Sequence, residues 1–202
     1  MSEKDSIFTR NVPGMTDRLA RCCVGVAGCG GLGSNVAVAL TRAGVGHLIL
    51  ADFDKVEPSN LNRQSFFQKD IGRSKVEAIA DQLRAIQPGI FLDLFDSEVT
   101  PDNTADFFGG ADLLVEAFDD AVAKVQLIEA WTKAFPNRHI VCGNGLAGYG
   151  RTEDLKVVRT GRIVFCGDME SDMAMGLAAP RVLAVAAMQA NVAVELLMEG
   201  DK

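Results

Sequence analysis

A glycine-rich turn constrains this chain more than any other sequence feature. Gly28, Gly30 and Gly33 fit the pattern G-x-G-x-x-G, and Gly31 adds a fourth glycine to the same turn. Glycine lets a backbone turn sharply and approach a ligand without a clash at Cβ. A helix that begins at such a turn presents free N–H groups and a positive dipole end to an anion. The turn therefore predicts a phosphate-binding site between a strand and a helix.

Short apolar runs around this turn predict a sheet. They show no polar alternation, which is typical of strands buried on both faces. They alternate with segments of helical periodicity, which predicts a doubly wound, mostly parallel, Rossmann-like α/β sheet. The expected strands are residues 22–27, 47–51, 91–95, 113–117 and 140–142. The expected helices are residues 34–43, 74–86, 121–135 and 180–198, with a short one that begins at Thr100-Pro101.

Two further segments differ from this alternation. Residues 155–159 and 162–165 flank Thr160-Gly161, which predicts a short antiparallel hairpin near the C-terminus. Residues 54–70 are polar and lack periodicity. Long irregular segments inside compact domains are usually functional, so we expect this one to carry part of a site.

Length and charge limit the classes of partner. The 202 residues predict a single domain, residues 1–202. The net charge of −7 argues against a nucleic-acid or anionic membrane surface. No apolar run is expected to approach the length that spans a bilayer, and residues 1–17 lack the apolar region of a secretory signal. A cytoplasmic location is therefore expected.

The cysteines and histidines argue against a structural metal site. The five cysteines are odd in number, and no two have C-x-x-C spacing. The histidines are only two, His47 and His139. A structural zinc site is hard to assemble from this set, and we expect no zinc.

Charged residues follow the second expected strand. Asp52 comes directly after it, 19 residues after Gly33, where a Rossmann-type fold places an acid on a ribose hydroxyl. Arg63 and Lys75 follow in a cluster of polar residues. An oxidoreductase needs few charges in this region, so the two cations suggest clamps on a triphosphate.

With these features together, the chain resembles the ThiF-type, ubiquitin-activating-enzyme-like adenylyltransferases. The resemblance rests on residues 28–34, the segment DFDKVEPSNLNRQ at 52–64, residues 72–75 and FDD at 118–120. A G-x-x-x-P segment and helix at 176–197 extend it over nearly the whole chain. The compact length is most similar to the small members that serve a ThiS-like sulfur carrier protein.

The resemblance implies a site for ATP and Mg²⁺. Asp52 would bind the ribose, and Asp119 would hold Mg²⁺. The glycines of the turn would lie against the nucleotide, and the phosphates would be held by Ser59, Asn60, Arg63 and Lys75. The implied catalytic residues are Arg63, Lys75, Asp119 and Arg10. Arg10 is the first candidate for an arginine that reaches into the partner subunit of a homodimer, with Arg18 and Arg21 as alternatives.

The implied reaction is ATP-dependent adenylation of the C-terminal carboxylate of a small ubiquitin-fold sulfur carrier, for thiamine thiazole synthesis. A molybdopterin carrier or the tRNA-dehydratase branch of the family stays open. An NAD-dependent oxidoreductase is a further alternative, although the only tyrosine, Tyr149, lacks a lysine four residues later. A non-catalytic scaffold protein is the last alternative, although a scaffold would not need Asp52, Arg63, Lys75 and Asp119 together.

The chain also departs from its relatives. Many relatives carry a nucleophilic cysteine shortly before the G-x-x-x-P segment, but residues 168–173 contain none. The nearest is Cys166, which follows an apolar run at 163–165. We expect Cys166 to be buried and inert, since burial in apolar surroundings disfavours the thiolate. The many apolar residues at 177–197 predict a homodimer.

Overall fold

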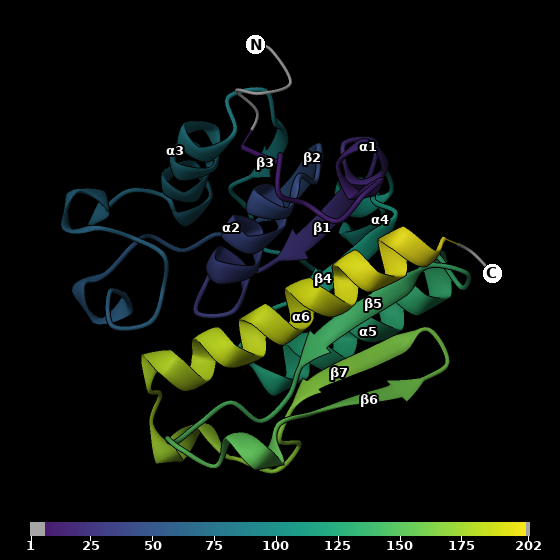
Figure 1. Cartoon of the computed structure of the whole chain (residues 1–202). Helices are drawn as coiled ribbons and strands as arrows, with labels where there is room; N and C mark the ends of the chain where they lie inside the picture. Colours follow the sequence, from purple (N-terminus) through teal and green to yellow (C-terminus); the bar gives the residue numbers. More distant parts are fainter. Residues whose placement is uncertain (1–6, 201–202) are drawn as a thin grey trace.

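The computed structural model describes residues 7–200, which form a seven-stranded sheet with helices on both faces (Figure 1). The strand order is β3-β2-β1-β4-β5-β7-β6. The strands are β1 (Cys23–Ala27), β2 (His47–Ala51), β3 (Phe91–Phe95), β4 (Leu113–Glu116), β5 (His139–Gly143), β6 (Lys156–Thr160) and β7 (Ile163–Gly167). The helices are α1 (Met15–Leu19), α2 (Gly33–Ala43), α3 (Lys75–Ile86), α4 (Thr104–Phe108), α5 (Ala121–Ala134) and α6 (Ala179–Glu199).

All neighbouring strands pair in parallel except β6 and β7, which pair antiparallel. This confirms the doubly wound, mostly parallel sheet and the antiparallel segment near the C-terminus. The chain leaves β1 toward β2 and β3, and later continues from β4 toward β5. The connections therefore diverge between β1 and β4, the switch point at which ligands bind in such sheets.

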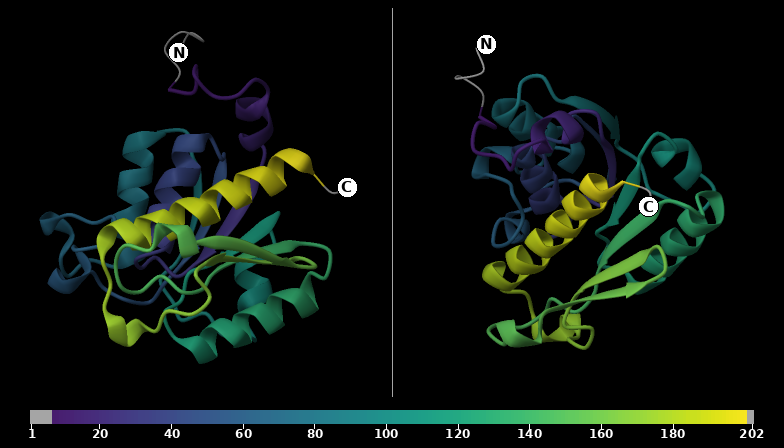
Figure 2. Two further views of the ribbon diagram at one scale, coloured as in Figure 1. Left: turned by 60° about the horizontal axis from the view of Figure 1, so that its bottom comes forward. Right: turned by 45° about the vertical axis from the view of Figure 1, so that its right-hand side comes forward.

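Helices cover both faces of the sheet (Figure 2), and a cluster of buried apolar residues lies on each face. On one face α2 and α6 pack together and α3 packs against α2. On the other face α4 and α5 pack together over a cluster that includes Phe108, Leu127 and Trp131. Both faces of the central strands are therefore buried, which explains why their sequences are almost entirely apolar and do not alternate with polar residues.

Helix ends follow the chemistry of their capping residues. Gly44 ends α2 with φ of 106°, and its N–H donates to the carbonyls of Leu40 and Thr41. A left-handed residue at this position favours glycine, which has no Cβ to clash. Asp120 begins α5 by accepting the N–H of Ala123 at 2.7 Å. Both boundaries lie within a residue of the predicted ones.

The short helix expected at Thr100-Pro101 begins later, at Thr104. Residues 101–103 instead form a turn, closed at both ends by local hydrogen bonds. The side chain of Asn103 accepts the N–H of Thr100, and the hydroxyl of Thr104 donates to the carbonyl of Thr100. Such side-chain bonds compete with helix formation. Helix α1 was not expected from the sequence at all.

Among the described residues, only helix α6 contradicts the expectation that no apolar run approaches membrane-spanning length. By length and composition alone it could cross a membrane. Here its apolar residues Val182, Val185 and Ala193 are buried, and the helix packs on α2, β5 and β7. The expectation that residues 1–17 lack a secretory signal falls in part on residues 1–6, which lie outside the described residues.

Candidate nucleotide-binding site

A cavity of about 640 Å³ lies at the carboxyl ends of β1, β2, β4 and β5. The turn after β1 and the polar segment after β2 line one part of it, and the loop after β4 lines the next. The loop after β5 and the segment before α6 complete the wall. The predicted site residues that line this cavity are Gly28, Gly30, Gly31, Asp52, Arg63, Lys75 and Asp119.

The glycine turn is closely packed on one side and open on the other. Gly28 has φ of 90°, and a Cβ there would lie 3.0 Å from the carbonyl oxygen of Ala117. Gly33 does not line the cavity, and a Cβ there would lie 1.8 Å from the carbonyl oxygen of Gly28. At Gly30 and Gly31 a Cβ would meet only side-chain atoms. The first and last glycines therefore shape the turn, while the middle two leave its backbone accessible from the cavity.

Asp52 joins the glycine turn to the end of β2. Its Oδ2 accepts the N–H of Cys29 at 2.6 Å and its Oδ1 accepts the N–H of Asp54 at 2.8 Å. Burial raises the pKa of this carboxyl, while the charge of Lys75 and the two hydrogen bonds oppose that rise. A buried carboxylate with remaining acceptor capacity at the cavity wall suits a ribose hydroxyl.

Two cations line the cavity. The Nζ of Lys75 pairs with Asp54 at 2.7 Å, and the lysine is almost fully buried. Lys75 is therefore not a solvated lysine on the surface of α3. The Nη1 of Arg63 donates to the side chain of Asn62 at 2.8 Å and to the carbonyl of Ser59 at 3.2 Å. These cations attract anions to the cavity, although Asp54 offsets part of the charge.

Ser59 and Asn60 do not line the cavity. Asn60 is buried, and its Oδ1 accepts the N–H of Glu57 at 3.0 Å. Its carbonyl accepts the N–H groups of Arg63 and Gln64. In this structure Asn60 therefore shapes the turn that carries Arg63, and its predicted contact with phosphate stays a prediction, as does that of Ser59.

Asp119 lies exposed at the edge of the cavity, on the loop after β4. The cap of α5 is Asp120 rather than Asp119, so capping does not account for Asp119. Among residues 7–200, no three acidic, histidine or cysteine side chains could hold a metal ion together. One carboxylate is nevertheless compatible with Mg²⁺, which keeps several waters and is often held by substrate phosphates.

The sequence matches the ThiF family over residues 6–201. The chain belongs to the ThiF family. It is 34% identical over 118 residues to the tRNA threonylcarbamoyladenosine dehydratase of Haemophilus influenzae, which covers 57% of this chain and 45% of that protein. It is 37% identical over 114 residues to the probable adenylyltransferase/sulfurtransferase MoeZ of Mycobacterium tuberculosis, covering 56% of this chain and 29% of that protein. The chain spans less than half the length of these curated relatives.

A solved structure with the same fold is that of the E. coli tRNA dehydratase TcdA in complex with ATP. Its TM-score is 0.84 at 23% identity, and the match covers 96% of this chain and 92% of that one. At this identity the likeness establishes the fold. It confirms the Rossmann-like ThiF fold that the sequence predicted.

Three further residues at this ThiF-family cavity were not expected from the sequence. Gln64 is buried, and its Oε1 has no hydrogen-bond partner among residues 7–200. Gln64 lines the cavity, and its Nε2 is the atom nearest to a Cβ placed at Gly30. Glu116 and Lys124 form a buried ion pair below the loop of Asp119. The sequence could have pointed to Glu116, because a charged residue is unusual at the end of an apolar run. It could not have pointed to Lys124, because lysines are common in helices.

The pair of Glu116 and Lys124 holds the loop of Asp119 in place. Glu116 is fully buried, and its Oε1 accepts the N–H of Phe118 at 2.7 Å. The Nζ of Lys124 contacts Glu116 Oε2 and donates to the carbonyl of Gly143 at 2.9 Å. The ends of β4 and β5 are thus joined across the base of the cavity.

All five cysteines are buried and free. Burial raises the pKa of Cys166 to about 11, while the charge of Arg159 lowers it slightly. The expectation that Cys166 is buried is therefore confirmed. Arg10 is exposed and does not line the cavity of its own chain, so its action on a partner subunit stays a prediction.

Proposed function

We propose that this protein uses ATP and Mg²⁺ to adenylate the C-terminal carboxylate of a small ubiquitin-fold sulfur carrier. The observation that carries the proposal is the composition of one cavity. It combines an accessible glycine backbone and the buried Asp52 with two cations, Arg63 and Lys75, and a single exposed carboxylate, Asp119. This set suits a nucleoside triphosphate with its metal better than it suits a dinucleotide.

The chemistry follows from the charges that these residues can stabilise. A carboxylate oxygen of the carrier attacks the α-phosphorus of ATP, and the bond to the bridging oxygen breaks as pyrophosphate leaves with the electron pair. Asp52 orients the ribose, while Arg63 and Lys75 stabilise the charge that develops on the phosphates. Asp119 would hold Mg²⁺, which supplies further charge neutralisation.

The identity of the carrier is the finer part of the proposal. The compact length favours a ThiS-like carrier and thiamine thiazole synthesis. The likeness to MoeZ and to tRNA threonylcarbamoyladenosine dehydratases favours, respectively, another sulfur carrier or a modified tRNA as second candidates. In each case the protein acts as an adenylyltransferase, as a homodimer in the cytoplasm, with Arg10 completing the partner subunit's site.

The test is ATP–pyrophosphate exchange with each candidate substrate. The arms are a ThiS-type carrier, a molybdopterin-type carrier and a threonylcarbamoyladenosine-bearing tRNA, with each carrier also tested without its terminal glycine. We expect exchange with the intact ThiS-type carrier and none with its truncated form. Exchange only with the tRNA would reassign the branch. NAD(H) binding without ATP binding would refute the adenylyltransferase function itself.

A further inference from the structure

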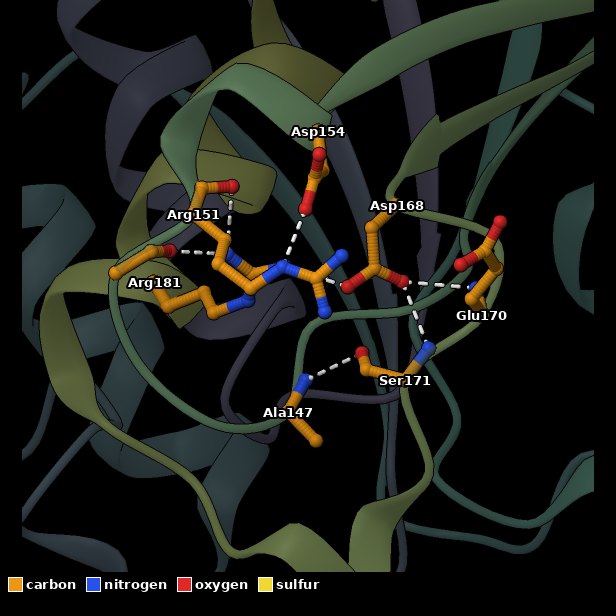
Figure 3. Close-up of polar contacts among 8 residues, drawn as sticks. Ala147, Arg151, Asp154, Asp168, Glu170, Ser171 and Arg181 are labelled. Atoms are coloured by element: carbon orange, nitrogen blue, oxygen red, sulfur yellow. Dashed lines mark hydrogen bonds and ion pairs between the residues drawn. The ribbon is translucent and has the colours of Figure 1, made fainter.

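A buried ion pair lies beside the cavity without lining it (Figure 3). Asp168 follows β7, and Arg181 belongs to the first turn of α6. Their relative exposures are 7% and 6%. The Nη2 of Arg181 lies 2.5 Å from Oδ2 of Asp168. Burying two charges is costly unless their contacts satisfy them, and here Arg181 Nε has no hydrogen-bond partner among residues 7–200. Nothing in the adenylation chemistry above uses this pair.

Hydrogen bonds connect the pair to the loop after β5 and to the segment before α6. The Nη1 of Arg181 donates to the carbonyls of Gly150 and Arg151. The Oδ1 of Asp168 accepts the N–H groups of Glu170 and Ser171, both at 2.8 Å. Figure 3 shows these contacts converging from three parts of the chain. One ion pair therefore holds residues 150–151 and 168–171 against the start of α6.

The surrounding backbone fits tightly around Asp168. The hydroxyl of Ser171 accepts the N–H of Ala147 at 3.0 Å. The backbone N–H groups of Asp168 and Met169 also join the two loops, since they donate to the carbonyls of Gly145 and Asn144. A Cβ at Gly145 would lie 1.9 Å from Oδ1 of Asp168. Met169 has φ of 70°, a conformation that costs free energy in a residue other than glycine. Such a conformation persists only where neighbouring contacts impose it.

The two loops that the pair joins form one wall of the cavity. Asn144, Gly145 and Leu146 line it from the first loop, and Ser171 and Met173 from the second. Asp52, Arg63, Lys75 and Asp119 make no hydrogen bond or ion pair with Asp168 or Arg181. The nucleotide part of the cavity and this wall are thus held by separate sets of contacts.

We propose that Asp168 and Arg181 are a positioning pair that fixes the wall along which the carboxylate-bearing tail of the substrate lies. The inference rests on the proposed function, because it assigns this wall to the acyl substrate and the opposite part to ATP. A preorganised wall spares the substrate the cost of ordering two loops when it binds. The pair therefore acts on substrate affinity through Asn144–Leu146 and Ser171–Met173, and it leaves ATP binding unchanged.

The experiment compares Arg181→Met and Asp168→Asn with the wild type. Three quantities are measured: KM for the ThiS-type carrier in pyrophosphate exchange, the Kd of ATP with Mg²⁺ by calorimetry, and hydrogen exchange of residues 144–151 and 168–178. We expect KM to rise about tenfold or more, ATP affinity to stay within about twofold, and hydrogen exchange to accelerate in both segments. Arg181→Lys keeps the charge and should recover part of the KM loss.

A matched control uses the surface pair between Arg159 of β6 and Glu195 of α6, whose side chains are 43% and 42% exposed. Arg159→Met should change none of the three quantities. If a single variant fails to fold, the double variant Asp168→Asn/Arg181→Met removes both charges together and replaces it. Wild-type KM and wild-type hydrogen exchange in a folded variant would overturn the proposal, as would an equal loss of ATP and carrier affinity.

ATP binding and pyrophosphate exchange of the wild-type protein test the proposed function separately from the positioning pair. If ATP binds but no carrier supports exchange, the carrier assignment fails, and hydrogen exchange in the variants still decides on the positioning pair. Acceleration confined to the two segments then supports it. Unchanged exchange, or acceleration spread over the whole sheet, overturns it.

Discussion

The residues at this site do more than their sequence neighbourhood indicates. Asp52 was expected to bind a ribose, yet it also ties the glycine turn to β2 by accepting the N–H of Cys29. Lys75 was expected as a phosphate clamp, and it lies buried in an ion pair with Asp54. A motif predicts which residue types line a site. The hydrogen bonds and ion pairs that those residues make without a ligand depend on three-dimensional packing, which the motif does not specify.

Arg63→Ala should abolish measurable adenylate formation while the fold stays intact. Arg63 is partly exposed on an irregular segment, and within residues 7–200 its side chain donates hydrogen bonds only to Ser59 and Asn62. Loss of one charge-assisted contact at a developing charge costs roughly 3 kcal/mol, on the order of a hundredfold in rate. Pyrophosphate exchange and thermal unfolding measure the two effects. Wild-type exchange in this variant would remove Arg63 from the site.

Cys166→Ser should retain pyrophosphate exchange and still yield carrier adenylate. Because burial raises the pKa of Cys166 to about 11, the thiol form prevails at neutral pH, and the nucleophilic thiolate becomes populated only as the pH rises toward that value. Alkylation of the native protein by iodoacetamide at pH 8 should leave Cys166 unmodified. A covalent enzyme–carrier adduct that disappears in Cys166→Ser would contradict this prediction and make the cysteine a nucleophile.

At the scale of elements, the sequence predicted the sheet and long helices well because the apolar runs of β1, β2, β4 and β5 are almost wholly buried. Residues 47–51 and 91–95 form strands with the predicted bounds. Prediction failed where side chains close local turns, as at Asn103 before α4. It also missed Glu116 and Lys124, since neither residue carries a motif and their pairing depends on the neighbouring positions of β4 and α5.

Lys124→Met should destabilise the protein by about 3 to 5 kcal/mol at pH 7, because it leaves the buried Glu116 without its partner. Burial already raises the pKa of Glu116, and the charge of Lys124 opposes that rise. A raised folded-state pKa gives stability that is present at low pH and lost as pH rises through that value. The deficit of the variant should therefore shrink as pH falls from 7 toward 5.

Urea denaturation at several pH values measures this deficit. The double variant Glu116→Gln/Lys124→Met removes the uncompensated carboxyl, so its stability should depend less on pH over the same range than that of Lys124→Met. If the loss of unfolding free energy in Lys124→Met does not change with pH, then the ionisation of Glu116 is not its cause.

At the scale of the whole molecule, the structure changes the argument for a homodimer. The apolar composition of residues 177–197 suggested an interface, yet Val182, Val185, Val192 and Leu197 are buried within the same chain. Packing on the sheet and on α2 accounts for most of the apolar residues of α6. Sequence composition could not separate these two uses, because core packing and subunit contact both favour apolar side chains.

The remaining case for dimerisation rests on exposed apolar residues near the start of α6. Met173 and Met175 just before this helix, and Leu183 within its first turns, are large apolar side chains with substantial exposure. Surface residues of this kind are common singly, whereas several on neighbouring segments indicate a contact surface.

We therefore predict that the protein is a dimer at micromolar concentration and that Leu183→Glu shifts it toward monomer, since a buried unpaired charge is costly at an interface. Met198→Glu is the matched control, because Met198 is a comparably exposed apolar residue at the other end of the same helix. Sedimentation velocity should give a dimer for the wild type and for the control. A monomeric wild type would reject the dimer, and with it the action of Arg10 on a partner subunit's site.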